Sequence, residues 1–286
     1  PGHLIETDTE TDPMGELSGV YRHVGAGGTV ARPTKEGPAM LFCTVKGHPN
    51  APVVIGLLAS RRRVGYLLGC DPKRLGFLLK ESVAHPVPPV VIPNEKAKCQ
   101  EVVHLATDPD FDLRRLIPAP TNTPEDAGPY ITLGMCYASN PQTGESDVTI
   151  HRMCIQSRDE LSIFLQRHIG YFRELAEARG QSLPISISIG VDPAIEIASC
   201  FEPPTTPLGY DELQAAGALR HHPVELVQCL TINEHAIAHA EYVIEGEILP
   251  NVRVREDQNS NTGKAMPEFP GYCGPANQSL PIIKVK

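Results

Sequence analysis

Several side chains that could carry out chemistry lie close together at residues 147–152, which spell Asp-Val-Thr-Ile-His-Arg. The segment has the composition of a β-strand, in which alternate side chains point to the same face. An acid, a hydroxyl and an imidazole (Asp147, Thr149 and His151) would then share one face, while Arg152 would point to the other. A strand of this kind could contribute ligands to a bound ion.

Two further candidate ligands come from expected helices. Arg167 and His168 interrupt an otherwise apolar helical stripe, and Tyr210-Asp211-Glu212-Leu213 opens another helix, whose dipole stabilises carboxylates at that end. Asp, His and Glu without Cys suit a hard or borderline ion such as Mn²⁺ or Mg²⁺ better than structural zinc. By residue type alone, however, each side chain is more often a surface residue than a ligand, so both interpretations stay open.

Other motifs in the sequence give weaker evidence for a functional site. Residues 234–239, Glu-His-Ala-Ile-Ala-His, place two imidazoles four residues apart, but the glutamate precedes the first histidine instead of following it as in zinc proteases. A surface helix with two solvated histidines is the better interpretation. Residues 25–29 are glycine-rich but lack the spacing of a dinucleotide site, and the sequence contains no GxxxxGK[ST] phosphate loop.

Composition and charge exclude several classes of partner. The 286 residues include 34 acids and 25 bases, a formal net charge of −9, which disfavours a nucleic-acid partner. The longest strongly apolar stretch, residues 52–59, is far shorter than the roughly 20 residues needed to cross a membrane. The eight cysteines are widely spaced, as in a reduced, cytoplasmic protein. The sequence begins without Met and ends within an expected strand, so we expect a fragment of a longer chain.

The two halves of the sequence differ in pattern. The first hundred residues alternate between strands (39–45 and 52–57) and short helices (61–68 and 72–83), and an acidic, proline-containing connector follows at 108–120. The second half is strand-rich and predicts an antiparallel barrel or sandwich. Its expected strands are 130–139, 147–156, 185–191, 224–230, 241–249 and 280–285. Alternating Ile and Ser at 185–189 indicates a half-buried strand. Residues 157–180, taken alone, predict one helix, with a capping box at Ser157 and Glu160.

Longer motifs resemble a known family. Residues 126–132 (Asp-Ala-Gly-Pro-Tyr-Ile-Thr), 147–152, 192–194 (Asp-Pro-Ala) and 240–246 (Ala-Glu-Tyr-Val-Ile-Glu-Gly) are similar, in order, to motifs of UbiD-type decarboxylases. Residues 203–207 (Pro-Pro-Thr-Thr-Pro) and 266–272 (Met-Pro-Glu-Phe-Pro-Gly-Tyr) resemble the branch that acts on hydroxybenzoic acids such as protocatechuate, 4-hydroxybenzoate or gallate. The resemblance covers nearly the whole chain.

The resemblance implies an α+β fold in two parts. Residues 1–107 would form an N-terminal α/β domain, and residues 108–286 a split β-barrel domain that binds prenylated FMN. A third, C-terminal domain of the family would be absent. Whole members of the family form homodimers or higher homo-oligomers, and a flavin prenyltransferase supplies their cofactor.

The same resemblance assigns site residues. The metal, Mn²⁺ or Mg²⁺, would bind Asp147 (where the family has Asn), His168 and Glu212, and the family also allows for K⁺. The catalytic residues would be Arg152, facing the substrate carboxylate, and Glu268 as the acid. The expected cofactor contacts are Thr149, Ile150, His151, Arg152, Phe164, Leu165, Gln166, Arg167 and His168.

Two departures from the family pattern leave alternatives open. The position five residues after Glu268, where the family has a second acid, holds Cys273. Since the family pattern can be placed in more than one way between Glu247 and Glu268, Glu256 or Asp257 is an alternative acid. The glycine-bearing turn that precedes Arg-His in the family is also shortened here. We therefore expect two helices within 157–180 and about two residues missing between Gln166 and Arg167.

The activity implied is the non-oxidative, reversible decarboxylation of a hydroxylated benzoic acid. The cofactor would carry the difficult step, and the protein would supply orientation and a proton. Two alternatives remain: an FMN-binding oxidoreductase on a similar barrel, and a non-catalytic cofactor-binding or assembly fragment.

Overall fold

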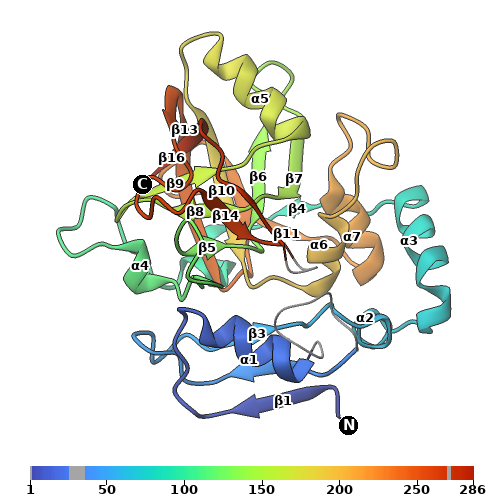
Figure 1. The fold of residues 1–286 in the computed structure, drawn as a ribbon. Coiled ribbons are helices and arrows are strands. Elements are labelled where there is room, and N and C mark those ends of the chain that lie inside the picture. The colour runs from blue at the N-terminus through green and yellow to red at the C-terminus, as the bar shows by residue number, and fades with distance from the viewer. Residues whose placement is uncertain (1, 26–35, 269–271) are drawn as a thin grey trace.

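The computed structural model describes residues 2–25, 36–268 and 272–286, and of Arg167 it describes the backbone alone. Most of the glycine-rich segment noted above, residues 26–29, lies outside the described residues. The chain forms a small N-terminal layer below a large curled sheet, which helices cover at its top and side (Figure 1).

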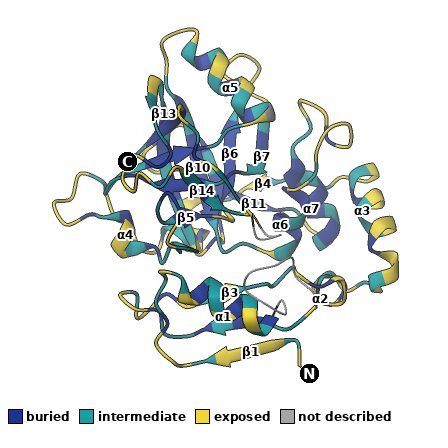
Figure 2. Cartoon of the chain, in the orientation of Figure 1, coloured by how far each residue is buried: buried dark blue, intermediate teal, exposed yellow. Residues whose placement is uncertain are grey.

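The N-terminal layer is a three-stranded sheet with one helix against it. Strands β1 (Leu4–Thr7) and β2 (Ala39–Phe42) are parallel, and β3 (Val53–Ile55) pairs antiparallel with β2. Helix α1 (Glu16–Gly25) buries Leu17 and Tyr21 against Met40 and Phe42. The strands expected at 39–45 and 52–57 are confirmed over Ala39–Phe42 and Val53–Ile55. β1 lies at the edge and is mostly exposed (Figure 2).

The two short helices expected before residue 84 are confirmed as α2 (Arg61–Leu67) and α3 (Leu75–Ala84), the latter preceded by the 3-10 turn η1 (Pro72–Arg74). The Ser60 hydroxyl caps α2 by accepting the Arg63 backbone N–H at 3.2 Å. The Arg63 side chain is buried and donates to the carbonyls of Leu57 and Gly56 at 2.8 and 2.6 Å. Arg63 is thus not a solvated surface residue, because backbone carbonyls from the preceding segment provide acceptors for its guanidinium.

The second half forms an eight-stranded sheet in the order β5-β8-β9-β16-β13-β10-β6-β7, with every neighbouring pair antiparallel. This curled sheet confirms the expected barrel-like fold, and the fold class is α+β. Its strands are β5 (Tyr130–Ile131), β6 (Met135–Ser139), β7 (Ser146–Ile150), β8 (Met153–Ile155), β9 (Glu160–Ile163), β10 (Leu183–Ile189), β13 (Tyr242–Val254) and β16 (Leu280–Val285).

Two of the expected long strands are each divided into two. Residues 130–139 become β5 and β6, and residues 147–156 become β7 and β8. β7 pairs with β6 at one edge of the sheet, whereas β8 pairs with β5 and β9. The break falls at His151 and Arg152, so the regular alternation expected for these side chains ends there.

The single helix expected at 157–180 is wrong, and so are the two helices that the family pattern suggested. Residues 157–159 form a turn closed by the Gln156 N–H donating to the Glu160 carbonyl at 2.8 Å. β9 follows, between β8 and β16, and then helix α5 (Arg167–Glu177). Over so short a segment, the apolar residues of β9 fit the period of a helix as well as that of a strand. Hydrogen bonding to the two neighbouring strands, β8 and β16, stabilises the extended form.

Helix α5 lies across the top of the curled sheet (Figure 1). Its apolar face, including Ile169 and Phe172, packs into the core formed by the strands. At its C-terminal end Glu177 accepts hydrogen bonds from Arg253 Nη2, at 2.7 and 2.8 Å, and from the Asn251 backbone N–H at 2.6 Å. The far end of the helix is thereby tied to β13.

A second three-stranded sheet packs against one face of the main sheet, at β10 and β6. It contains β4 (Val90–Val91), β11 (Glu225–Gln228) and β12 (His235–Ile237), so the surface helix expected at 234–239 is wrong. The Ser186 hydroxyl donates to the His235 carbonyl at 2.6 Å, and Ser188 accepts the Ile237 N–H at 3.3 Å. Both serines are fully buried. β10 is therefore buried on both faces, not half-buried as its alternation suggested.

The remaining elements complete the second core, in which α6 (Pro193–Ala198) and α7 (Glu212–Arg220) pack against β6, β7 and β11. The turns η2 (Asn94–Lys96) and η3 (Lys98–Gln100) precede the connector, which carries α4 (Leu113–Leu116). Strand β14 (Lys264–Pro267) pairs with β15 (Cys273–Pro275). All eight cysteines are free thiols. No helix among the described residues has the length and apolar character needed to span a membrane.

Candidate functional site

The three expected metal ligands lie together. Asp147 comes from β7, His168 from the first turn of α5, and Glu212 is the first residue of α7. Their ligand atoms all lie within 4.8 Å of one another, and His168 Nδ1 is 2.8 Å from Asp147 Oδ1. Three segments that are distant in sequence thus meet at one point.

The charges of this cluster favour a cation. Asp147 and Glu212 are each 3% exposed, and Glu212 Oε2 has no hydrogen-bond partner among the described residues. Burial, followed by the charge of Asp147, raises the pKa of Glu212 to about 8. Burial also raises the pKa of Asp147, opposed by its hydrogen bond to His168. An unpaired buried oxygen beside a second carboxylate is costly unless a cation balances it. The donor set therefore fits Mn²⁺ or Mg²⁺.

The neighbouring Asp211 has a structural role. Its Oδ1 caps α7 by accepting the Leu213 N–H at 2.8 Å, and its Oδ2 accepts the Ser146 hydroxyl at 2.7 Å. Both oxygens are thus occupied, which leaves Glu212 to face the cluster. The helix start expected at residues 210–213 is confirmed.

Arg152 lies in the break between β7 and β8 and forms a two-pronged ion pair. Its Nε and Nη2 donate to Glu256 Oε1 and Oε2 at 2.9 and 3.0 Å. The guanidinium carbon lies 4.5 Å from the centre of the Phe164 ring, which suits a cation–π contact. Sequence reasoning proposed Glu256 only as an alternative acid and missed this pair, which spans 104 residues and leaves no local signal.

Glu268 lies just beyond β14 and is exposed. It lines a cavity of about 760 Å³ between the N-terminal layer and the curled sheet, together with Thr132, Glu196 and Met266. Asp257, the other alternative acid, is buried and bonded within its own loop. The structure thus brings Glu268 to an open cavity, whereas Glu256 and Asp257 are enclosed.

The expected cofactor contacts lie along two adjoining segments. Thr149, Ile150, His151 and Arg152 run from the end of β7 into the break, and Phe164, Leu165 and Gln166 link β9 to α5. The latter three line a cavity of about 310 Å³ that also includes Asn277 and Ser279. Of Arg167 the structure describes the backbone alone. A further cavity of about 670 Å³, beside the connector and β13, contains none of the expected site residues.

Gln166 has an extended backbone (φ −137°, ψ 166°), and α5 begins at Arg167. No continuous helix passes through these two residues. The shortening relative to the family at this point stays a prediction.

The sequence matches the family described as 3-octaprenyl-4-hydroxybenzoate carboxy-lyase, its Rift-related domain over residues 90–286 and its N-terminal domain over residues 1–82. Since the first match alone covers more than half of the chain, the protein belongs to the UbiD family.

Two similar proteins are named for the decarboxylation of hydroxylated benzoic acids. The chain is 54% identical to gallate decarboxylase of Lactiplantibacillus plantarum over its full length, which is 59% of that protein. The structure superposes on apo 3,4-dihydroxybenzoic acid decarboxylase (AroY) of Klebsiella pneumoniae with a TM-score of 0.94 and 60% identity, covering all of this chain and 59% of that one.

A more distant neighbour carries the cofactor. The UbiD-class enzyme HmfF of Pelotomaculum thermopropionicum, in complex with prFMN, matches with a TM-score of 0.86 and 34% identity, covering 99% of this chain and 61% of HmfF. The chain thus spans about three fifths of the length of the relatives it matches.

Proposed function

We propose that the protein, as part of the whole enzyme, is a carboxy-lyase that removes CO2 reversibly and without oxidation from a hydroxylated benzoic acid such as protocatechuate, 4-hydroxybenzoate or gallate. The identity of 54% to a gallate decarboxylase, maintained over the full length of this chain, supports the reaction. We also propose prenylated FMN as cofactor, since HmfF was solved with it.

Asp147, His168 and Glu212 would hold the metal, Mn²⁺ or Mg²⁺, and K⁺ is a further candidate. The closeness of these three side chains, and the buried Glu212 Oε2 that has no hydrogen-bond partner among the described residues, support this role. Thr149, Ile150, His151 and the segment 164–168 would hold the flavin. Prenylated FMN, when bound, supplies the electrophilic centre that accepts the electron pair left as CO2 departs.

The chain's own residues would orient the substrate and supply the proton. The Arg152 guanidinium would bind the substrate carboxylate, for which its planar fork is suited. Glu268, exposed on its cavity, would protonate the ring carbon after the bond to the carboxylate breaks, and water would then restore its proton. A phenolic hydroxyl on the substrate would help the ring to lose aromaticity transiently.

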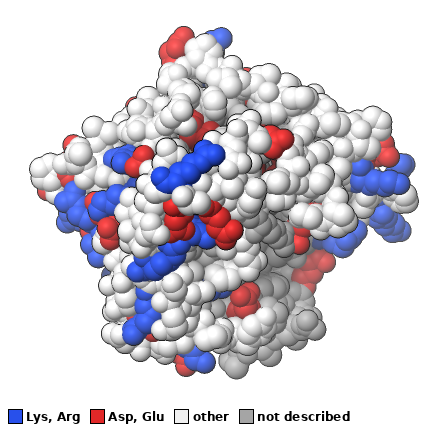
Figure 3. All heavy atoms as spheres, turned by 90° about the horizontal axis from the view of Figure 1, so that it is seen from above, with Lys and Arg blue, Asp and Glu red and all other residues white. Residues whose placement is uncertain are grey.

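We keep residues 1–107 as the proposed N-terminal domain and 108–286 as the proposed flavin-binding domain, with β4 reaching across to pair with β11. We also propose that the whole enzyme is a cytoplasmic homodimer or higher homo-oligomer, supplied with cofactor by a flavin prenyltransferase. The eight free thiols support a reducing compartment. Figure 3 shows basic and acidic side chains interspersed over one face, which gives a nucleic-acid partner no support there.

The test is reconstitution of the full-length protein with prenylated FMN and Mn²⁺. Conversion of protocatechuate, 4-hydroxybenzoate and gallate to catechol, phenol and pyrogallol would be followed by chromatography, with ordinary FMN as the control. Loss of CO2 from at least one acid, dependent on the prenylated cofactor, is expected. If no acid reacts and the bound flavin bleaches with NAD(P)H, the proposal is wrong and an oxidoreductase is favoured.

A further inference from the structure

We propose that Glu196 binds the 3-hydroxyl of the substrate ring and so selects acids with adjacent hydroxyls, such as protocatechuate, over 4-hydroxybenzoate. That the ligand is a hydroxybenzoic acid rests on the proposed function. That Glu196 is available to receive a hydroxyl rests on the described residues alone.

Glu196 is a buried acid that lacks a partner. It lies on α6 and is 7% exposed, and its Oε2 makes no hydrogen bond to any described residue. Among the described residues, the charged group that acts on it is Asp192, which is also an acid. Burying an acid without a hydrogen bond or an opposite charge is unfavourable. A ligand that supplies the missing hydrogen bond accounts for an acid at this position.

The Glu196 side chain lines the cavity of about 760 Å³ between the N-terminal layer and the curled sheet. Glu268, the proposed proton donor, lines the same cavity. A proton donor must come within hydrogen-bond reach of the carbon that it protonates, so the substrate ring belongs in this cavity. Ile189 and Met266 contribute apolar walls, which suit the faces of an aromatic ring. Glu196 is thus placed to contact a polar substituent of that ring.

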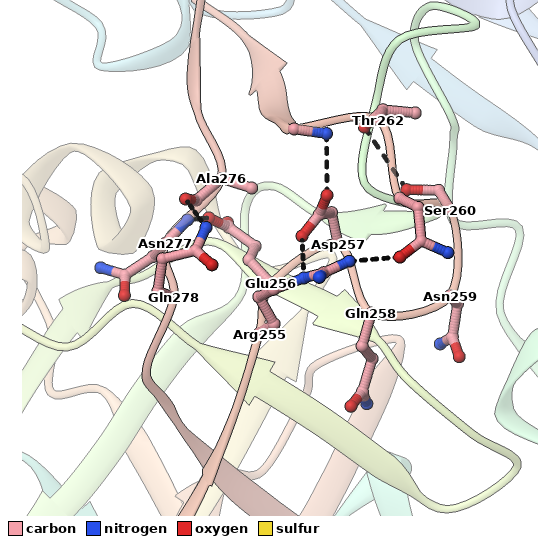
Figure 4. Close-up of polar contacts among 12 residues, drawn as sticks. Arg255, Glu256, Asp257, Gln258, Asn259, Ser260, Thr262, Ala276, Asn277 and Gln278 are labelled. Carbon is pink, nitrogen blue, oxygen red and sulfur yellow. Dashed lines mark hydrogen bonds and ion pairs between the residues drawn. The ribbon is translucent and has the colours of Figure 1, made fainter.

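The substrate carboxylate is expected at the other end of the ring, toward Arg152. Tyr130 lines the cavity, and its hydroxyl donates to Glu256 Oε1 at 2.9 Å. Glu256 lies in the loop drawn in Figure 4 and forms the ion pair with Arg152 described above. A carboxylate beside Asp192 and Glu196, in contrast, would be repelled by like charge. The group of the substrate that lies near Glu196 is therefore an uncharged one.

A hydroxyl is the uncharged group that suits Glu196. Burial, followed by the charge of Asp192, raises the pKa of Glu196 to about 7. Near neutral pH the carboxyl is therefore present both with and without its proton. Either form accepts the hydrogen of a phenolic hydroxyl, and the protonated form also donates to the hydroxyl oxygen. A metal ion fits less well, because no group of three ligand atoms among the described residues includes Glu196.

The 3-hydroxyl is assigned because the 4-hydroxyl has another role. All three acids of the proposed function carry a 4-hydroxyl, whereas protocatechuate and gallate add a 3-hydroxyl. The 4-hydroxyl lies opposite the reacting carbon and conjugates with it, so it assists the transient loss of aromaticity. The 3-hydroxyl does not conjugate with that carbon. A residue that binds the 3-hydroxyl therefore distinguishes the acids by affinity without taking part in bond breaking.

The test compares Glu196→Leu with wild type in the full-length, cofactor-loaded enzyme, with protocatechuate and 4-hydroxybenzoate as substrates. Leucine is close to glutamate in size but forms no hydrogen bond through its side chain. We expect kcat/KM for protocatechuate to fall roughly 10- to 100-fold, mainly through KM, because the buried 3-hydroxyl loses its partner. The kcat/KM for 4-hydroxybenzoate should change little.

Two further variants separate binding of the hydroxyl from a structural role. Glu196→Gln still accepts and donates hydrogen bonds, so it should keep most of the preference for protocatechuate. Glu241→Leu is the matched control, because Glu241 lines the same cavity but is exposed, and it should leave the ratio of the two kcat/KM values unchanged. An equal loss for both acids in Glu196→Leu, or the same change of ratio in Glu241→Leu, would overturn the inference.

A second measurement does not need activity. Catechol and phenol differ by the same hydroxyl, and their binding to the cofactor-free, full-length protein can be compared by calorimetry. Wild type should bind catechol roughly tenfold or more tightly than phenol, and Glu196→Leu should lose this preference. A wild type without the preference, or a preference that survives in Glu196→Leu, would contradict the assignment. If wild type releases no CO2 from any acid, the proposed function fails, and the binding comparison still decides the role of Glu196.

Discussion

Glu196 gives a prediction whose size can be worked out from the structure. It lies on α6, is 7% exposed, and its Oε2 has no hydrogen-bond partner among the described residues. Burial, followed by the charge of Asp192, raises the pKa of Glu196 from 4.5 to about 7. The folded protein therefore keeps a proton that the unfolded chain has already lost, and the free energy of unfolding falls as pH rises from 4.5 to 7.

At about 1.4 kcal/mol per unit, this shift corresponds to a loss of roughly 3 kcal/mol once the pH exceeds 7. Glu196→Gln mimics the protonated form at every pH. We expect it to match wild type near pH 4.5 and to be more stable by up to about 3 kcal/mol at pH 8. Because the side chain lines a cavity that admits water, this value is an upper figure.

The assay is urea unfolding of both full-length proteins at pH 4.5 and pH 8, followed with the same spectroscopic probe. Glu241→Gln is the control, because Glu241 lines the same cavity but is exposed. A stability difference between Glu196→Gln and wild type that is the same at both pH values would refute the reasoning.

Three further changes test the proposed site. Arg152→Ala should abolish decarboxylation while circular dichroism stays that of the folded protein; near-normal turnover would contradict the assignment. Glu268→Gln should lose most activity, measured as CO2 release, because an amide cannot donate a proton as an acid does; if Cys273→Ala is the more damaging change, the choice of acid is wrong. His168→Ala should lose stoichiometric metal in elemental analysis, because Asp147 and Glu212 alone leave an incomplete ligand set; metal retained at wild-type level would exclude His168 as a ligand.

Local sequence signals predicted most strands of the second half but not their breaks. The alternating residues of β10 and the apolar run of β16 determine extended structure locally. The break at His151 and Arg152 arises because β7 and β8 pair with different neighbours, and this depends on strands far away in sequence. The error at residues 157–166 has the same origin, since β9 is extended through pairing with β8 and β16.

The residues of the candidate site were likewise only partly predictable from the sequence. Asp147, His168 and Glu212 could be named because family motifs mark their positions, and residue types alone left them undecided. No motif or local pattern in the sequence identified the Arg152–Glu256 pair or the buried Glu196. Glu256 became identifiable only when the loop after β13 was seen to fold back over the β7–β8 break, bringing together residues 104 positions apart.

The way in which α5 is attached bears on when the cofactor can be added. Its last residue, Glu177, bonds to β13, while its first turn carries His168, which lies beside Asp147. The metal and flavin of the proposed function would therefore complete one end of a helix that is already held at the other. Loading of this kind can follow synthesis and folding. On the proposed function, the folded protein then needs only its flavin and metal to become active.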